Sequence, residues 1–240
     1  MIKTENLTKR YGDAVAVDRL NLKIERGELF SLLGVNGAGK STTIKMLSCL
    51  VQPTGGEAFI GGHSTTKEQW QVKRLIGVSP QETAVAPALS VKENLELMCG
   101  IYGLTRQQRQ ERIDQLAGQF DLWQVLSKRA GKLSGGWQRR VSIAMALVSE
   151  PTVLFLDEPT LGLDVIARRE LWDVIRAMKG KVTIMLTTHY MEEAEALSDR
   201  IGIMKDGKLL TVGTAQELME KTGADKFENA FISIAKGAGV

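Results

Sequence analysis

Residues 34–41, Gly-Val-Asn-Gly-Ala-Gly-Lys-Ser, constrain the fold of this chain more than any other segment. The mostly apolar residues 29–33 come directly before them and predict a buried strand. A helix is expected directly after them, with Ile44, Leu47 and Val51 on one face. A Gly-x-x-x-x-Gly-Lys-Ser segment between a strand and a helix is the pattern of a phosphate-binding loop. The sequence therefore predicts an α/β fold in which this loop binds a nucleotide.

The residues of the loop have distinct expected roles. The glycines let the backbone curl so that successive amide groups face phosphate oxygens, and the helix adds the positive end of its dipole. Lys40 is expected to reach the β- and γ-phosphates and to contribute to catalysis, and Ser41 is expected to bind Mg²⁺. The nucleotide-binding residues predicted in the loop are Gly34, Asn36, Gly37, Ala38, Gly39, Lys40, Ser41 and Thr42.

Two carboxylates, Asp157 and Glu158, follow the apolar residues 153–156. In a doubly wound sheet, the carboxyl end of such a strand faces the phosphate loop. Asp157 is expected to hold Mg²⁺ through its water shell. Glu158 is expected to orient or deprotonate the attacking water.

A third element, Leu133-Ser134-Gly135-Gly136, lies between the loop and the acidic pair. Together the three elements resemble the ABC ATPases, the nucleotide-binding subunits of ATP-binding-cassette transporters, over nearly the whole chain. The resemblance implies that Ser134, Gly135 and Gly136 contact the ATP of the opposite subunit, and hence a head-to-tail homodimer or pseudo-symmetric dimer. Trp137 stands where the family most often has Gln, so altered local packing is expected there and not a dead site.

The same resemblance implies roles for four further residues. Gln81 would sense Mg²⁺ and water at the γ-phosphate, which adds it to the metal and catalytic residues. His189 would hydrogen-bond the γ-phosphate and bracket Glu158. Asp164 would cross the dimer interface, although taken alone it is an ordinary N-cap for the next helix. Tyr11 would stack on adenine.

The resemblance implies one ABC ATPase domain over residues 1–240, and the changes of pattern along the chain predict its parts. Residues 1–81 and 151–240 are expected to form a P-loop NTPase core with a mainly parallel sheet and an N-terminal antiparallel β subdomain. Residues 82–150 are helical and charged in pattern, which predicts an inserted helical subdomain that carries the Ser134 element.

Individual elements are predicted from periodicity and from breaker residues. The helix after Ser134 is expected to continue to Pro151, and a later helix to end at Gly180. Residues 236–240 are expected to be a loose tail. The expected strands span residues 2–7, 15–18, 20–24, 29–33, 153–156 and 182–186.

Composition limits the partners and the location. Lys and Arg total 31 against 28 Asp and Glu, with no long basic block, so no direct nucleic-acid partner is expected. No apolar run approaches the roughly 20 residues of a membrane-spanning helix. We therefore expect a peripheral protein on the cytoplasmic face of the cell membrane. Cys49 and Cys99 are interpreted as small apolar helix residues and His63 as an exposed turn residue.

Two stretches bear on the kind of ABC ATPase. Residues 89–95 with 102–104, and residues 213–218 running into 223–231, resemble the ATPase subunits of ABC-2-type exporters, a group that includes drug efflux systems. The resemblance implies separate integral membrane permease subunits, one cytoplasmic helix of which would sit in a groove near residues 81–102. An ABC importer subunit and a soluble, non-transporting ABC ATPase stay open as alternatives. P-loop kinases and small GTPases are disfavoured by the Ser134 element.

Overall fold

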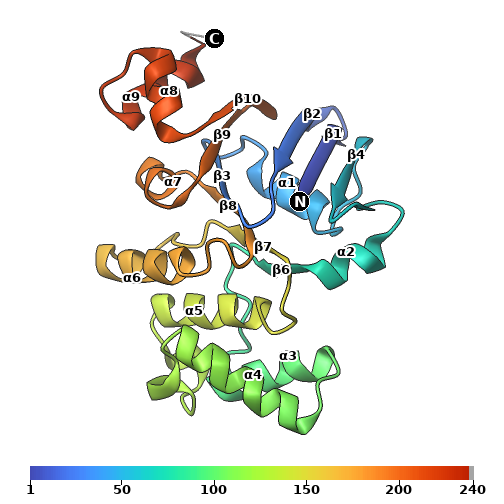
Figure 1. Cartoon of the computed structure of the whole chain (residues 1–240), viewed down its shortest axis with the longest axis vertical. Coiled ribbons are helices and arrows are strands. Elements are labelled where there is room, and N and C mark those ends of the chain that lie inside the picture. Colours follow the sequence, from blue (N-terminus) through green and yellow to red (C-terminus); the bar gives the residue numbers. More distant parts are fainter. Residues whose placement is uncertain (238–240) are drawn as a thin grey trace.

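Two sheets and nine α-helices are found in residues 1–237, the part of the chain that the computed structural model describes (Figure 1). The strands are β1 (Ile2–Tyr11), β2 (Ala14–Ile24), β3 (Leu29–Leu33), β4 (Gly55–Ile60), β5 (His63–Ser64), β6 (Ile76–Ser79), β7 (Val153–Asp157), β8 (Thr183–Thr188), β9 (Arg200–Lys205) and β10 (Lys208–Gly213). The α-helices are α1 (Lys40–Leu47), α2 (Gln69–Leu75), α3 (Val91–Ile101), α4 (Arg106–Gln119), α5 (Gly135–Ala146), α6 (Val165–Arg176), α7 (Met191–Leu197), α8 (Ala215–Thr222) and α9 (Phe227–Lys236). Residues 238–240 of the expected tail lie outside the described residues.

The central sheet has six strands in the order β10-β9-β3-β8-β7-β6. Five of them are parallel, and β10 pairs with β9 in antiparallel fashion. All five residues of β3 are buried between neighbours on both sides, which explains its continuous apolar sequence. The carboxyl ends of β3, β7 and β8 therefore meet at one edge of the sheet. The predicted mainly parallel α/β core is confirmed.

The second sheet is antiparallel, with the order β2-β1-β4-β5, and the predicted N-terminal antiparallel sheet is confirmed. The prediction of a break near Arg19 was wrong. Arg19 adopts a left-handed backbone with φ +45°, and a register shift there lets β2 continue past it. His63 is not an exposed turn residue either, because it lies in β5 and its Nδ1 is 2.9 Å from Glu68 Oε1.

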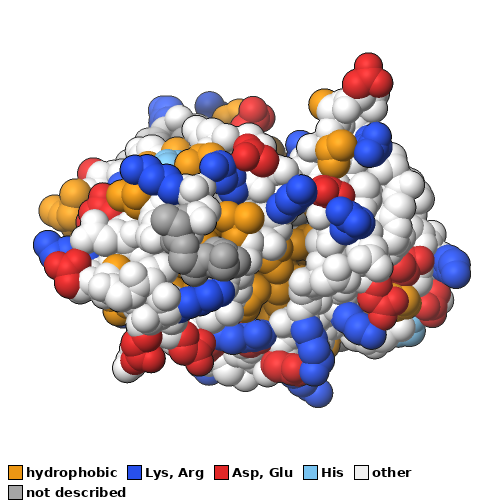
Figure 2. Space-filling model, turned by 90° about the horizontal axis from the view of Figure 1, so that it is seen from above, with side chains coloured by type: hydrophobic (Ala, Val, Ile, Leu, Met, Phe, Trp, Pro, Cys, Tyr) orange, Lys and Arg blue, Asp and Glu red, His pale blue; other side chains and the backbone are white. Residues whose placement is uncertain are grey.

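Residues 82–150 contain α3, α4 and α5 together with two short 3₁₀ turns, Trp123–Val125 and Ala130–Lys132. Ser90 and Thr105 begin α3 and α4 as capping boxes, each hydroxyl accepting from the amide three residues on. These helices form one end of the molecule, and α8 and α9 form the other (Figure 1). Seen from the α8–α9 end, acidic and basic side chains are interspersed around a hydrophobic hollow (Figure 2).

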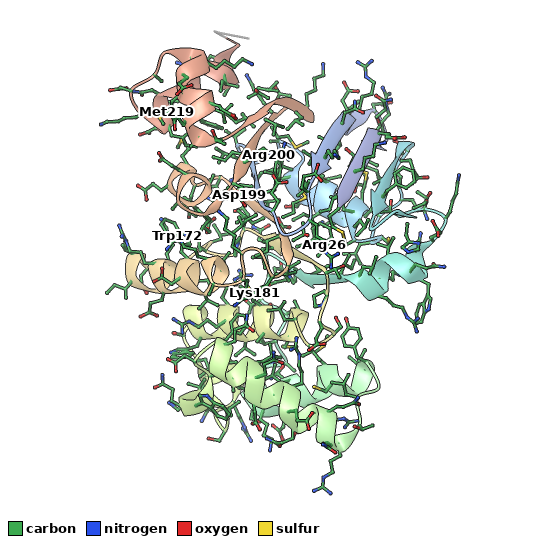
Figure 3. All side chains as sticks on the ribbon, viewed as in Figure 1. Arg26, Trp172, Lys181, Asp199, Arg200 and Met219 are labelled. Atoms are coloured by element: carbon green, nitrogen blue, oxygen red, sulfur yellow. The ribbon has the colours of Figure 1, made fainter. Side chains whose placement is uncertain are left out.

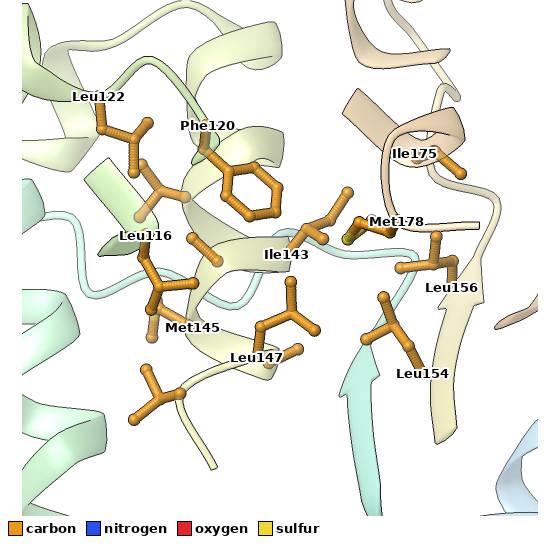
Figure 4. Packing of buried hydrophobic residues seen from close by; sticks show 14 of the residues in the cluster. Leu116, Phe120, Leu122, Ile143, Met145, Leu147, Leu154, Leu156, Ile175 and Met178 are labelled. Carbon is orange, nitrogen blue, oxygen red and sulfur yellow. The ribbon is translucent and has the colours of Figure 1, made fainter. Parts of the chain in front are cut away.

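One apolar cluster joins the helical end of the molecule to the central sheet (Figure 4). Phe120 after α4 and Ile143 of α5 pack with Leu154 and Leu156 of β7 in this cluster. Because side chains alternate along a strand, Phe155 points to the other face of the sheet, into a second cluster with α1 and the antiparallel sheet. Helix α5 is therefore packed as part of the core and fixes where Ser134 lies.

Three helix ends differ from the prediction. Helix α1 stops at Leu47, because the Ser48 hydroxyl bonds Ile44 O at 2.8 Å and Cys49 turns to φ +58°. Cys49 and Val51 are therefore not helical, whereas Cys99 is a buried residue of α3 as expected.

Helix α5 ends at Ala146, before Pro151, since Glu150 already adopts a left-handed backbone with φ +53°. Helix α6 ends at Arg176, before Gly180. No helix among residues 1–237 is long and apolar enough to span a bilayer.

Candidate active site

The loop between β3 and α1 has the shape that its glycines predict. A Cβ atom on Gly34 would lie 2.3 Å from Met204 O, and one on Gly39 would lie 2.3 Å from Ala16 O, so no side chain fits at either position. Gly37 and Gly39 adopt φ +81° and +103°, which L residues rarely reach. Packing and backbone conformation together therefore require these glycines.

Lys40 opens α1 and is only 5% exposed. Its Nζ donates to Gly34 O at 2.8 Å and to Val35 O at 3.2 Å, and it lies 3.4 Å from Glu158 Oε1. The ammonium group is thus held over the loop by carbonyl oxygens. A phosphate group is a stronger acceptor than these carbonyl oxygens and could replace them.

Ser41 and Asp157 meet although they lie 116 residues apart. The Ser41 hydroxyl donates to Asp157 Oδ1 at 3.0 Å, and the Thr187 hydroxyl at the end of β8 donates to the same oxygen. Asp157 is 6% exposed and ends β7. Strand pairing and these two hydroxyls therefore fix this carboxylate at the sheet edge beside the loop.

Glu158 follows with an unusual backbone of φ +47°. Its amide donates to the Thr187 carbonyl and hydroxyl oxygens, both at 3.1 Å, which hold it in this conformation. The ring Nδ1 of His189 lies 2.7 Å from Glu158 Oε2 and donates to it when that nitrogen carries its proton. The Glu158 carboxylate is thus held between a lysine and a histidine, and it is only 7% exposed.

The Ser134 element lies at the start of α5. Ser134 occupies the N-cap position and is exposed, but its hydroxyl makes no cap hydrogen bond. A Cβ on Gly136 would lie 3.1 Å from the Ala167 side chain, and one on Gly135 would lie 3.6 Å from Leu163. This element therefore packs near the start of α6, while Ser134 and Gly135 stay exposed.

The structure brings the sequence-predicted residues together in two groups. Lys40, Ser41, Asp157, Glu158 and His189 form one hydrogen-bonded group at the carboxyl edge of the sheet. The Ser134 element and Asp164 form a second group, which shares no hydrogen bond or ion pair with the first among residues 1–237. One chain alone does not join the two groups.

Comparison with known proteins identifies the family. A sequence model of the ABC transporter family matches residues 17–161, more than half of the chain. The chain belongs to the ABC transporter family. It is therefore an ATP-binding ABC ATPase.

Relatives agree with this assignment. This ABC ATPase is 41% identical over 228 residues to the daunorubicin resistance ATP-binding protein DrrA3 of Streptomyces coeruleorubidus, covering 95% of this chain and 72% of that protein. It is 40% identical over 240 residues to the probable multidrug ABC transporter ATP-binding protein YbhF of Escherichia coli K12, covering 98% of this chain and 41% of that protein. The chain thus spans less than half the length of the second relative.

A solved structure extends the comparison from the sequence to the fold. The ATP-binding cassette MJ0796, determined as a dimer in a post-hydrolysis state with ADP and Pi, matches with a TM-score of 0.80 at 30% identity. The match covers 89% of this chain and 98% of that one. The fold of the ABC ATPase family is therefore confirmed.

The backbone at Pro80 and Gln81 is held by a residue that the sequence did not single out. Arg139 of α5 is 4% exposed, and its guanidinium donates to Pro80 O at 2.7 Å and to Gln81 O at 2.6 Å. Burial lowers the pKa of Arg139, and the nearby Asp157 and Glu193 act against this shift. The Gln81 side chain is exposed. Arg139 could have been found from its position one turn into the helix that begins at the Ser134 element.

Tyr11 and Asp164 take positions that leave their assigned roles open. Tyr11 ends β1 and is 50% exposed, with Lys9 Nζ 5.0 Å from the ring centroid. Asp164 caps α6, because its Oδ1 accepts from the Ile166 and Ala167 amides at 2.9 Å. The second carboxylate oxygen of Asp164 takes no part in this cap.

Proposed function

We propose that this ABC ATPase hydrolyses ATP at the interface of a head-to-tail dimer and powers an exporter, most like the ABC-2 type. The similarity to drug-resistance ATP-binding proteins over almost the whole chain carries the exporter assignment. The uncapped hydroxyl of the exposed Ser134 supports the dimer. In such a dimer, Ser134, Gly135 and Gly136 of one subunit would face the γ-phosphate held by the loop of the other.

The geometry suggests how the residues divide the chemistry. Glu158 would orient the attacking water and accept its proton, and Oε2 is held by His189 while Oε1 faces Lys40. Lys40 would exchange its backbone carbonyl partners for phosphate oxygens. Tyr11 would offer its exposed ring to adenine, a contact worth about 1–3 kcal/mol by analogy with base stacking.

Mg²⁺ fits the oxygen atoms that the chain presents. Ser41 Oγ and Asp157 Oδ1 lie 3.0 Å apart, and hydroxyl and carboxylate oxygens are the ligands that Mg²⁺ prefers. The Gln81 side chain would supply a further oxygen near the γ-phosphate. When bound with ATP, Mg²⁺ neutralises the charge that develops on the phosphate oxygens.

A groove between α2 and the helices α3, α4 and α5 supports the assignment of a membrane partner. It contains the exposed apolar residues Leu50, Trp70 and Ile101, which are 67%, 69% and 67% exposed. Arg74 lies 5.5 Å from the Trp70 ring centroid at the same site. We propose that a cytoplasmic helix of a separate permease docks here, which would place this chain on the cytoplasmic face of the membrane.

A pull-down of tagged Glu158→Gln protein with ATP and Mg²⁺ from detergent-solubilised native membranes tests the transporter assignment. Recovery of a polytopic membrane protein in stoichiometric amount would support it, and the direction of transport would then separate exporter from importer. Recovery of soluble partners alone, from well-solubilised membranes, would favour a non-transporting ABC ATPase.

A further inference from the structure

Glu193 is a buried carboxylic acid that the chemistry described above does not use. It lies in α7, four residues after His189, and is 0% exposed. Its Oε1 accepts a hydrogen bond at 3.0 Å from Nε1 of Trp172, a residue of α6 that is labelled in Figure 3, so one side of the carboxyl group is anchored to a helix. Full burial of an acid that binds no ligand of the active site calls for a structural or a coupling role.

The other side of the carboxyl group is incompletely bonded. Glu193 Oε2 and Thr160 Oγ1 are both fully buried and without a hydrogen-bond partner among the described residues. Such atoms are rare in folded proteins, because each has lost its water without a replacement. Thr160 lies in the loop of residues 159–164 between Glu158 and Asp164.

The two atoms belong to one neighbourhood. Burial raises the pKa of Glu193, while hydrogen bonding by the Thr188, Thr160 and Trp172 side chains and the charge of Arg168 act to lower it. Thr160 is therefore close to the carboxyl group, although its hydroxyl and Glu193 Oε2 do not reach full hydrogen-bond geometry. Thr188 also accepts from the Tyr190 amide at 2.9 Å, which connects the carboxyl group to the backbone on both sides of His189.

We propose that Glu193 is a positioning residue that couples the loop of residues 159–164 to His189. When a second subunit presses on that loop, Thr160 completes its hydrogen bond with Glu193, and through Thr188 this holds His189 in the contact that it already makes with Glu158. The inference rests on the proposed dimeric ATPase. It adds a route by which dimer closure reaches the site within one subunit.

The hydrogen bonds of the Glu193 side chain predict which substitution at this position keeps the coupling between residues 159–164 and His189. The amide of Gln can accept from Trp172 through its oxygen and donate to Thr160 Oγ1 through its nitrogen, so it can replace both contacts of the carboxyl group. Glu193→Gln should therefore keep kcat within about twofold of the parent. Glu193→Ala should lower kcat about tenfold, within the usual range of coupling between sites, while KM for ATP stays unchanged.

The test measures ATPase kcat, KM and Tm for the full chain with four variants: Glu193→Gln, Glu193→Ala, Thr160→Val and the double variant Glu193→Ala/Thr160→Val. The inference expects the single variants Glu193→Ala and Thr160→Val to lose similar activity and the double variant to lose no more. The inference is wrong if the fold loss of kcat in the double variant equals the product of the two single losses. It is also wrong if Glu193→Gln loses as much kcat as Glu193→Ala. If Glu193→Ala does not fold, Thr160→Val decides alone: parent kcat overturns the inference, and a tenfold loss at unchanged KM supports it.

Two controls separate this inference from its alternatives. Glu28→Ala removes another buried glutamate, at the opposite edge of the sheet, and should lower Tm while leaving kcat unchanged. Glu158→Gln, assayed alongside, should be nearly inactive. If Glu158→Gln turns over at the parent rate, the proposed catalytic assignment fails; if only Glu193→Ala does so, the coupling role alone fails.

Discussion

The two edges of the central sheet carry similar charged residues, but these residues are paired in different ways. At the amino edge, Arg200 pairs with Glu28 at 2.8 and 3.0 Å (Figure 3). Beside this pair, Asp199 accepts from the Leu29 amide at 2.9 Å and pairs with Lys179 at 2.6 Å. At this edge, the chain itself supplies a partner for each of these charges.

The carboxyl edge is arranged differently. Lys40 donates to two backbone carbonyls, and Glu158 is held at φ +47° by the end of β8. Partners of this kind can be replaced by phosphate oxygens, and a strained backbone aims a carboxylate that would otherwise point elsewhere. The difference teaches that complete pairing serves the stability of the fold, whereas replaceable pairing leaves the site ready for a ligand.

The largest expected effect comes from the carboxyl edge. Glu158→Gln should lower kcat about 10²- to 10⁴-fold, since a positioned base is lost, while ATP binding stays near the parent value. Single-turnover hydrolysis and equilibrium binding of ATP measure the two quantities. Turnover near the parent rate would contradict the assignment of Glu158 as the catalytic base. The two edges would then no longer differ in function.

The second effect concerns the Ser134 element, which in the proposed dimer completes the carboxyl edge of the other subunit. Ser134→Ala should weaken ATP-driven dimerisation about tenfold, because one hydrogen bond to a charged group is lost. Nucleotide binding to the monomer should not change, since Ser134 lies outside the group around Lys40. Analytical ultracentrifugation in the Glu158→Gln background measures the dimer. Equal loss of binding and dimerisation would count against a two-subunit site.

A third prediction concerns the amino edge. Arg200→Gln should lower the free energy of unfolding by about 1–3 kcal/mol, because the mostly buried Glu28 loses its partner. The lower end of this range is expected, since the Arg200 side chain is 36% exposed. Denaturant unfolding measures this loss, and kcat should be unchanged. A large fall in kcat would mean that the two edges are coupled.

The smallest effect is a pH dependence. Burial raises the pKa of Glu193, so the folded state keeps this proton at pH values where the unfolded chain has lost it. The resulting cost to stability is absent below the ordinary glutamate pKa and grows as pH rises through the raised one. Arg168 and Arg139, which face the carboxyl group, reduce the cost.

The Glu193→Gln variant lacks this proton equilibrium and serves as the reference. Its Tm relative to the parent should therefore increase as pH rises above about 4, by about 2–4 °C for each kcal/mol. Thermal melts in matched buffers measure the difference. A difference that is constant with pH would indicate that the carboxyl group titrates normally.

The sequence predicted the parts of the molecule that follow from local pattern. The prediction was close for the apolar strands β3 and β7 and for the glycine loop between β3 and α1. Burial on both faces of a strand requires apolar residues, and close contacts in the loop require glycine, so both features can be read from residue type. The strands β4, β6, β9 and β10 were not predicted. Gly77 of β6 and Gly202 of β9 interrupt their apolar runs, since each has close neighbours that exclude a side chain.

Long-range partners explain what the sequence could not predict about the site. Arg139 and Glu193 look like ordinary charged helix residues in the sequence, and only the packing of α5 and α7 buries them. The early end of α1 at Leu47 depends on one serine hydroxyl and on Cys49 in a left-handed conformation. Neither feature produces a periodicity that a sequence pattern could detect.

Helix α5 has a mechanical consequence. Ser134 lies at its amino end, and Met145 and Ala146 near its other end line the groove beside α2. A helix of 12 residues is about 18 Å long, so a tilt of about 10° applied at the groove would move the serine by about 3 Å. That displacement is the length of a hydrogen bond. In the proposed dimer, helix α5 would therefore act as a lever arm between a permease helix docked in the groove and the ATP bound by the neighbouring subunit.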